Sequence, residues 1–440
     1  MRVDLQCAVF VCLVVGGRIT TALPAGTSAT IVYTDTLPNT PLSRWKAQLR
    51  YGRPDSLRNS PFQSKEAVEA INFRSDLEYY SAVSFGTPPQ TFKVMLDTGS
   101  ADTWVIARGC PTSKCANHAT FDKTISTTYR NGSSDWQVTY GDHSFAGGFS
   151  GWDTLRIGAL TITNQSLGLA MYASPQFTND VVDGIVGLSF RGVSNNPDNR
   201  TPMDRLVEDH LLPEPLFAVY FPPRQVASVG EFTFGTVNSA RYHGDLVYVP
   251  LSRKPYWQFE LEAAYIGNTV VDQRVQCMVD TGTNVLLVSN EAARAIHLQI
   301  PGARETRSDG WIIPCSRFTA SAATSALPGA NESTTVSPAP SSTALIAKSQ
   351  SFSPDSTHAR RSDLGPALTI QFSINGHNFT VPVASLPLEP VKSRPGFCYS
   401  GVAGGSPRWI LGTIFIKHNY VVFDHGRERL GFAPIRHSSS

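Results

Sequence analysis

The chain has 440 residues, which is enough for more than one hydrophobic core, so two domains are the natural expectation. Its formal net charge is only +2 and charged residues make up 16% of the chain, which argues against a nucleic-acid-binding surface or an acidic binding tail. The 34 glycines and 30 prolines, together with many β-branched and aromatic residues, indicate short strands and turns, so the predicted fold class is mainly all-β.

The N-terminus is typical of a cleaved secretory signal, which we assign to residues 1–22. Arg2 precedes the apolar run 5–15, and small residues near Ala22 offer a cleavage site. The run is well short of the roughly 20 apolar residues that a membrane-spanning helix needs. Residues 436–440 also lack the hydrophobic tail of a lipid-anchor signal. We therefore predict a secreted protein without a membrane anchor, with a vacuole as the alternative destination.

Residues 23–72 are more basic and less aromatic than the sequence that follows them. Such a stretch is either a solvated leader or an inhibitory pro-segment, and the second interpretation gains weight only if a protease follows. We assign a basic pro-segment, in which Lys46 or Lys65 would place an ammonium group against an ionised active site. Acid would protonate the carboxylates that hold the segment and release it.

A β-strand pattern begins after the pro-segment. Residues 79–85 predict a strand, residues 86–89 a turn, and the next strand ends at Asp97. Residues 136–140 predict a strand that enters a hairpin tip at 141–144.

Helices should be few and short, and the clearest one begins with Thr201 as its N-cap and Pro202 in its first turn. Residues 318–363 stand apart, because most of this stretch is Ala, Ser, Thr, Pro and Gly, with too little apolar mass to offset chain entropy. We predict a disordered surface insertion there. Its Arg360–Arg361 pair is either a processing site or a plain exposed basic pair.

The cysteines fit an oxidising compartment. Of the seven cysteines, two leave with the signal. Cys110 and Cys115 are near enough in sequence to close a small loop, and Cys315 with Cys398 is then the simplest second pair. Cys277 is left in an apolar run, where a thiol behaves as a small buried hydrophobe. The Asn-x-Ser/Thr sequons are compatible with secretion and begin at Asn131, Asn164, Asn199, Asn331 and Asn378.

One short motif occurs twice and carries the chemistry. Asp97-Thr98-Gly99-Ser100 recurs as Asp280-Thr281-Gly282-Thr283, each time after an apolar strand-like run. A single copy is weak evidence, since Asp and Gly are common in tight turns. Two copies by chance are on the order of one in ten thousand.

Two carboxylates held close together cannot both ionise easily, so they share one proton. Asp97 and Asp280 would jointly polarise a water molecule, remove its proton as it attacks a peptide carbonyl, and protonate the departing nitrogen. Ser100 and Thr283 are placed to donate hydrogen bonds to the outer carboxylate oxygens, which favours the ionised form and an acidic working pH.

Further motifs extend the pattern. Trp104 follows the first copy, Tyr140-Gly141 lies at the hairpin tip, and the pattern apolar-apolar-Gly occurs within residues 183–188 and 409–412. With these motifs the chain, from about Leu77 to Pro434 apart from the insertion, resembles the pepsin-like aspartic proteases, and among them the secreted or vacuolar fungal members.

The resemblance implies a bilobal β-barrel fold with pseudo-twofold symmetry and an active-site cleft between the lobes, here residues 73–252 and 253–440. It implies the Cys110–Cys115 and Cys315–Cys398 disulfides, and glycines that let backbone N–H groups approach the carboxylates. It also implies that Thr98 and Thr281 each bond to the opposite loop.

For the flap, the resemblance implies that Tyr140 and Gly141 close over the substrate and that Trp104 supports the tyrosine. At the tip, Asp142 and Ser144 are candidates for accepting a lysine before the scissile bond, and a plain turn aspartate is the equal alternative.

Two departures from the family pattern bear on the structure. Thr413 stands where aspartate is common, which puts one buried hydrogen bond in doubt, and His143 replaces a usual flap glycine.

The predicted function is an acid-working aspartic endopeptidase, made as a secreted zymogen, that acts on protein or peptide substrates as a monomer. We expect no cofactor, no metal ion and no nucleic-acid partner. The alternative is a catalytically silent pepsin-like protein that acts as a binding protein or inhibitor. Such a protein usually lacks one aspartate, a motif threonine or the flap tyrosine, and all of these are present here.

Overall fold

The computed structural model describes residues 67–73, 78–111, 115, 117–195, 200–223, 227, 229–315 and 368–436. The predicted signal, most of the pro-segment, the insertion 318–363 and the sequons at Asn199 and Asn331 lie outside the described residues. Asn131, Asn164 and Asn378 are described, and all three are exposed.

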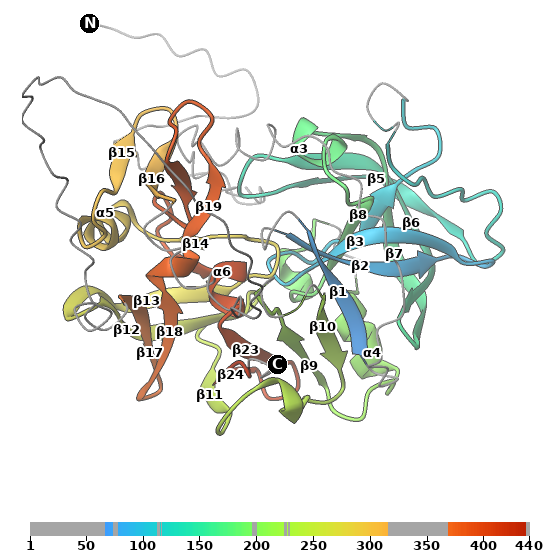
Figure 1. Cartoon of the computed structure of the whole chain (residues 1–440). Helices are drawn as coiled ribbons and strands as arrows, with labels where there is room; N and C mark the ends of the chain where they lie inside the picture. Colours follow the sequence, from blue (N-terminus) through green and yellow to red (C-terminus); the bar gives the residue numbers. More distant parts are fainter. Residues whose placement is uncertain are drawn as a thin grey trace, which may run out of the picture. The chain divides into compact units, whose positions relative to one another are not determined.

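The described residues are organised mainly in three sheets (Figure 1). The first has 13 strands among the described residues, in the order β11 (Val247–Pro250), β24 (Arg429–Pro434), β23 (Asn419–Asp424), β9 (Leu216–Tyr220), β10 (Val229–Phe234), β1 (Ala67–Phe73), β2 (Glu78–Phe85), β3 (Gln90–Asp97), β8 (Gly184–Gly187), β4 (Trp104–Ile106), β7 (Leu160–Ala173), β6 (Phe145–Ile157) and β5 (Arg130–Thr139).

Two smaller sheets come from the second half of the chain. One has the order β18 (His377–Pro382), β17 (Thr369–Ile374), β12 (Gln258–Ile266), β13 (Thr269–Val279), β22 (Trp409–Leu411), β14 (Leu286–Leu287) and β21 (Val402–Ala403). The other has the order β15 (Arg304–Thr306), β16 (Gly310–Pro314), β20 (Phe397–Ser400) and β19 (Pro387–Pro390).

The helices among the described residues are short: α3 (Pro175–Thr178), α4 (Pro202–Glu208), α5 (Asn290–Leu298) and α6 (Thr413–Ile416), with 3-10 turns η1 (Arg191–Val193), η2 (Ser239–Arg241) and η4 (Val383–Ser385). The predicted helix after Thr201 is confirmed as α4. Thr201 and Asp204 form a reciprocal capping box, so two otherwise unpaired backbone N–H groups at the helix start are satisfied.

The predicted mainly β, pepsin-like bilobal fold is confirmed, and the two halves of the sequence repeat one strand arrangement. In the first half, β8 pairs in parallel with β3 and antiparallel with β4. In the second half, β22 pairs in parallel with β13 and antiparallel with β14. Each of the two aspartate motifs therefore lies at the end of a strand that is held by an equivalent parallel neighbour.

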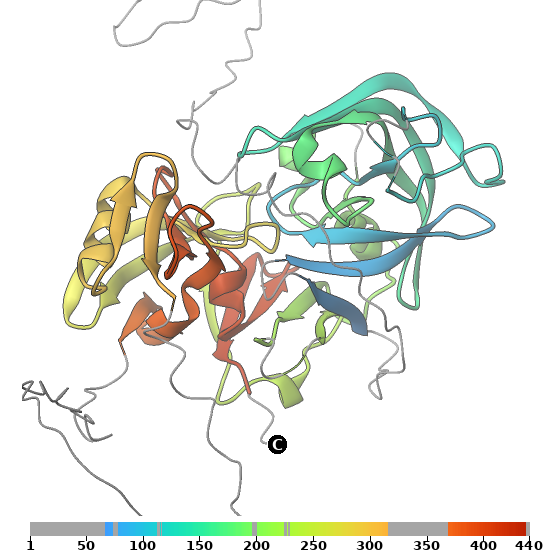
Figure 2. The ribbon, with the colours of Figure 1, turned by 45° about the horizontal axis from the view of Figure 1, so that its top comes forward.

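Strands distant in sequence join the halves. β23, near the C-terminus, pairs with β9 along residues 421–424, and Figure 2 shows this red strand beside the green one. The rings of Phe217 and Phe423 stack across this pair with centroids 4.6 Å apart. Buried apolar side chains of both halves form one continuous core.

Strand β1 includes residues 67–72, which the sequence had placed in the pro-segment. It lies between β10 and β2 in the first sheet, pairing Ile71 with both Val229 and Tyr80. Val68 and Ala70 are buried, so this strand contributes to the core of the folded body.

Candidate active site

The two aspartate motifs occupy equivalent places at the ends of strands. Asp97 is the last residue of β3 and pairs with Gly187 of β8. Asp280 directly follows β13, whose last residue Val279 pairs with Leu411 of β22. Because parallel neighbours hold both strand ends, each motif is presented from a rigid sheet rather than from a free loop.

The structure brings the two carboxylates together. The carboxylates of Asp97 and Asp280 lie close enough for the negative charge of Asp280 to raise the pKa of Asp97, and the two residues are only 5% and 7% exposed. Gly99 and Gly282 make this approach possible. A Cβ atom on Gly99 would lie 2.6 Å from the Asp280 carboxylate, and one on Gly282 would lie 2.4 Å from Oδ1 of Asp97. Any side chain at either glycine would therefore collide with the carboxylate of the opposite motif.

Each carboxylate has the same pair of hydrogen-bond donors. The backbone N–H of Gly99 donates to Oδ1 of Asp97 and that of Gly282 to Oδ1 of Asp280, both at 2.8 Å. The hydroxyl of Ser100 donates to Oδ2 of Asp97, and that of Thr283 donates to Oδ2 of Asp280 at 2.6 Å. The hydroxyl bonds expected from the sequence are present in both halves.

Burial and charge dominate the protonation of Asp97. Burial first, and then the negative charge of Asp280, raise the pKa of Asp97 well above its usual range. The hydrogen bonds from Ser100 and Gly99 lower the pKa but do not outweigh these effects. The hydroxyl bond of Ser100 thus favours the ionised form, as the sequence analysis expected, while the desolvation of Asp97 has the larger effect.

Thr98 and Thr281 tie the two motifs to each other. The backbone N–H of each threonine donates to the hydroxyl oxygen of the other, at 3.0 Å in both directions. The hydroxyl of Thr98 donates to the carbonyl of Val279 at 3.1 Å, and that of Thr281 to the carbonyl of Leu96 at 2.6 Å. All four groups are buried, so the two halves are held in register by contacts that water cannot replace.

Glycines also fit the strands behind the motifs. A Cβ on Gly187 would lie 2.4 Å from the backbone of Ala101, and one on Gly412 would lie 2.3 Å from the carbonyl oxygen of Thr283. Thr413, where the family pattern has aspartate, donates its hydroxyl to the carbonyl of Asn284 at 3.2 Å. A hydroxyl therefore supplies a buried hydrogen bond at this position.

The predicted flap is the hairpin of β5 and β6. Tyr140 follows β5, and its hydroxyl accepts a hydrogen bond from Nε1 of Trp104 at 2.7 Å. The ring of Phe177 from α3 packs edge-on against both aromatic residues, with centroids 5.4 Å from Tyr140 and 5.1 Å from Trp104. Trp104 thus contacts the tyrosine in the way that the resemblance implied, and Phe177 makes a second aromatic contact that no sequence pattern indicated.

At the hairpin tip, Asp142 takes part in the turn itself. Its Oδ1 accepts hydrogen bonds from the backbone N–H of Ser144 at 3.0 Å and from the Ser144 hydroxyl at 2.5 Å. His143 has φ of 62°, in the left-handed region that favours glycine. A Cβ on Gly141 would meet no atom within 4 Å, so packing does not require that glycine.

The described cysteines form two disulfides and one free thiol. Disulfides join Cys110 to Cys115 and Cys315 to Cys398, as expected. Cys277 is a fully buried free thiol in β13, and burial raises its pKa well above the usual range. It therefore stays protonated and packs as a small apolar group. Among the described residues, no helix is both long and apolar enough to cross a membrane.

Comparison with known proteins agrees with this geometry. The family model described as "Eukaryotic aspartyl protease" matches residues 78–343 and 360–435. Gastricsin of Homo sapiens is 31% identical over 369 residues, covering 81% of this chain and 81% of the relative. Rhizopuspepsin-1 of Rhizopus niveus is 29% identical over 375 residues, covering 85% of this chain and 83% of the relative. The chain therefore belongs to the eukaryotic aspartyl protease family.

Proposed function

We propose that this protein is an aspartic endopeptidase that hydrolyses peptide bonds at acidic pH with Asp97 and Asp280 as its catalytic pair. The observation that carries the proposal is the pair of buried carboxylates, each packed against the glycine of the opposite motif and each with the same backbone donor. The raised pKa of Asp97 means that the pair retains one proton over a wide pH range.

The pair would act as acid and base together. The ionised member accepts a proton from a water molecule as the water oxygen attacks the peptide carbonyl carbon, while the protonated member donates to the carbonyl oxygen. The proton gained from water then passes to the amide nitrogen as the C–N bond breaks. Ser100 and Thr283 hold the outer oxygens, which leaves the inner oxygens for the reaction.

The flap would complete the site by covering a bound peptide. Tyr140, supported by Trp104 and Phe177, would close over the substrate and exclude water. Substrates are therefore proteins or peptides. The pairing of Tyr140 with a buried tryptophan supports a defined closed position for the hairpin.

We further propose that the protein is a secreted glycoprotein, made as a zymogen with the segment before Ala67 as its inhibitory part. Two observations on the described residues support this: the three described sequons are exposed, and two disulfides are present. Because β1 lies within the first sheet, activation should cut before Ala67 rather than after residue 72.

The test is expression of the full chain in a eukaryotic secretory host, followed by acidification. We expect an N-terminus that begins before Ala67, cleavage of peptides with an acidic optimum, and inhibition by pepstatin. Asp280→Asn should lower kcat/KM by at least about 10²- to 10⁴-fold. A folded wild-type chain that binds but never cleaves peptides would support the silent binding protein, and an optimum above neutrality would contradict the proposed chemistry.

A further inference from the structure

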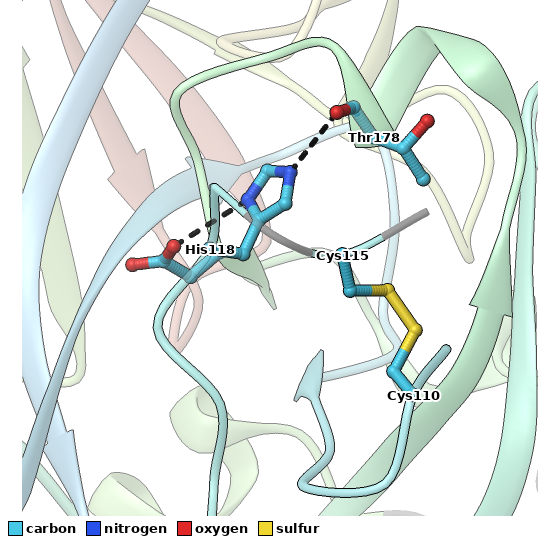
Figure 3. Close-up of a disulfide and its surroundings, with 5 residues drawn as sticks. Cys110, Cys115, His118 and Thr178 are labelled. Atoms are coloured by element: carbon cyan, nitrogen blue, oxygen red, sulfur yellow. Dashed lines mark hydrogen bonds and ion pairs between the residues drawn. A yellow bond between two sulfur atoms is a disulfide. The ribbon is translucent and has the colours of Figure 1, made fainter. Parts of the chain in front are cut away.

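His118 is a buried histidine that no sequence motif singled out and that the catalytic chemistry does not use. Its side chain is 1% exposed and lies close to the Cys110–Cys115 disulfide (Figure 3). Nδ1 lies 3.5 Å from Oδ1 of Asp183, and Nε2 lies 3.3 Å from the carbonyl oxygen of Thr178. The ring therefore sits between a strand end and a helix end.

Both neighbours of the ring are hydrogen-bond acceptors. A neutral imidazole has one N–H, so it can satisfy the carboxylate or the carbonyl but not both. The imidazolium has two N–H groups, so it can donate to the Thr178 carbonyl while its charge forms an ion pair with the Asp183 carboxylate 3.5 Å away. The charged groups that face the ring are Asp183 and Asp180, and both favour the protonated form. Burial alone would lower the pKa of His118, but the contacts with Asp183 and Thr178 outweigh it and the pKa is raised.

One side of this contact is fixed to the sheet behind the catalytic motif. Asp183 immediately precedes β8, and its carboxylate also accepts the backbone N–H of Lys93 and of Ala119, each at 2.9 Å. The backbone N–H of Asp183 donates to the carbonyl of Lys93 at 2.7 Å. Lys93 belongs to β3, the strand that ends at Asp97, so Asp183 is a firm anchor.

The other side of the contact leads to the flap. Thr178 is the last residue of α3, and its neighbour Phe177 is the ring that packs against Tyr140 and Trp104. α3 has only four residues and its N-cap makes no side-chain hydrogen bond, so the helix has little stability of its own. A contact at its last carbonyl can therefore decide how firmly Phe177 is held.

We propose that protonated His118 is a positioning residue that ties α3 to Asp183 and thereby holds Phe177 against the flap tyrosine. This inference deepens the proposed function and rests on it. We call the two contacts of the protonated ring, with Asp183 and with Thr178, the His118 bridge. In acid this bridge is complete, so α3 and Phe177 are held firmly in the pH range where the carboxylate pair is active. As pH rises and the ring loses a proton, one of the two contacts is lost and α3 is held less firmly.

Kinetics of three variants test the bridge. His118→Phe removes both donors, His118→Gln keeps one, and His377→Gln is the control, because His377 is exposed on the β17–β18 hairpin. We expect His118→Phe to raise KM about tenfold in acid, as for a lost charge-assisted hydrogen bond of about 1.4 kcal/mol, with kcat within about twofold. His118→Gln should lie between His118→Phe and wild type, and the KM of wild type should approach that of the variants toward neutrality. KM values equal to wild type in both His118 variants at every pH would overturn the proposal.

A second measurement does not depend on catalysis. In an Asp280→Asn background, the ring nitrogens of His118 should both carry protons in acid by NMR and should lose one only above the ordinary pH range of histidine. Amide hydrogen exchange in α3 should be faster in His118→Gln than in the His377→Gln control. A neutral His118 ring in acid, or unchanged exchange in α3, would overturn the bridge even if the enzyme is active. If the wild type cleaves no peptide, the proposed function fails, while these two measurements still decide whether the bridge exists.

Discussion

Thr98 and Thr281 show how much a single side chain can determine in this fold. Each hydroxyl accepts one backbone N–H from the opposite motif and donates to one backbone carbonyl there. Thr98 is 1% exposed and Thr281 is 4% exposed, so water cannot take over these contacts. The geometry of the carboxylate pair therefore depends on threonine side chains that bond to the opposite motif's backbone and not to the carboxylates.

Replacing Thr98 with valine tests this dependence at constant volume. Thr98→Val leaves the N–H of Thr281 and the carbonyl of Val279 without their partner, so we expect a loss of about 1–3 kcal/mol in the free energy of unfolding, together with reduced kcat. Urea unfolding in an Asp280→Asn background avoids self-digestion. Thr98→Ser keeps the hydroxyl and is the matched control; equal stability of the two variants would show that the hydroxyl contacts contribute little.

At the scale of elements, Asp142 has two roles to distinguish in the flap hairpin, one in the shape of the turn and one in substrate selectivity. Its Oδ1 closes the turn through Ser144, while its charge is the feature that would attract a lysine side chain of the substrate. His143 adds a left-handed backbone at a non-glycine residue in the same turn. The turn therefore depends on Asp142 for its shape as well as for any selectivity.

Two substitutions separate these roles. Asp142→Asn keeps an oxygen acceptor for Ser144 but removes the charge, whereas Asp142→Ala removes both. We expect Asp142→Asn to lose activity on peptides with lysine before the scissile bond, by about tenfold, while cleavage after large apolar residues is retained. Asp142→Ala should lose activity on both kinds of peptide. If Asp142→Asn cleaved peptides with lysine before the scissile bond as well as wild type does, Asp142 would have only its role in the turn.

At the scale of the whole molecule, the protein must stay folded in the acid in which it is proposed to work. His297 of α5 is a buried histidine that should lower the stability of the folded protein in acid. Its Nδ1 contacts the carbonyl of Ala293 at 2.6 Å, its Nε2 contacts the hydroxyl of Ser400 at 2.7 Å, and its ring stacks on Trp311. Burial lowers the pKa of His297 to about 4. The folded protein therefore favours the neutral ring, while the unfolded chain takes up a proton from about pH 6.5 downward.

This difference makes stability fall with acid. The contribution from the neutral ring is fully present above about pH 6.5 and is lost as pH falls toward 4, by about 3 kcal/mol in total. We expect His297→Phe to be less stable than wild type at neutral pH, because two hydrogen bonds are lost. The difference in free energy of unfolding between the two proteins should become smaller as the pH falls. Urea unfolding at several pH values, in an Asp280→Asn background, measures this. If the difference in free energy of unfolding stayed constant with pH, protonation of His297 would not be the cause of the loss of stability in acid.

Much of the molecule follows from local features of the sequence. Turns, helix caps and strand alternation are short-range patterns, so a few adjacent residues are enough to predict them. This holds for the doubled Asp-Thr-Gly motif, the strands before it, the Tyr140 hairpin and the Thr201 cap. The tertiary structure decided what depends on distant partners: the desolvation that raises the pKa of Asp97, the Phe177 ring against Tyr140, the His118 bridge, and the place of β1 inside the sheet. Burial and long-range contact are properties of the folded chain, so no local pattern encodes them.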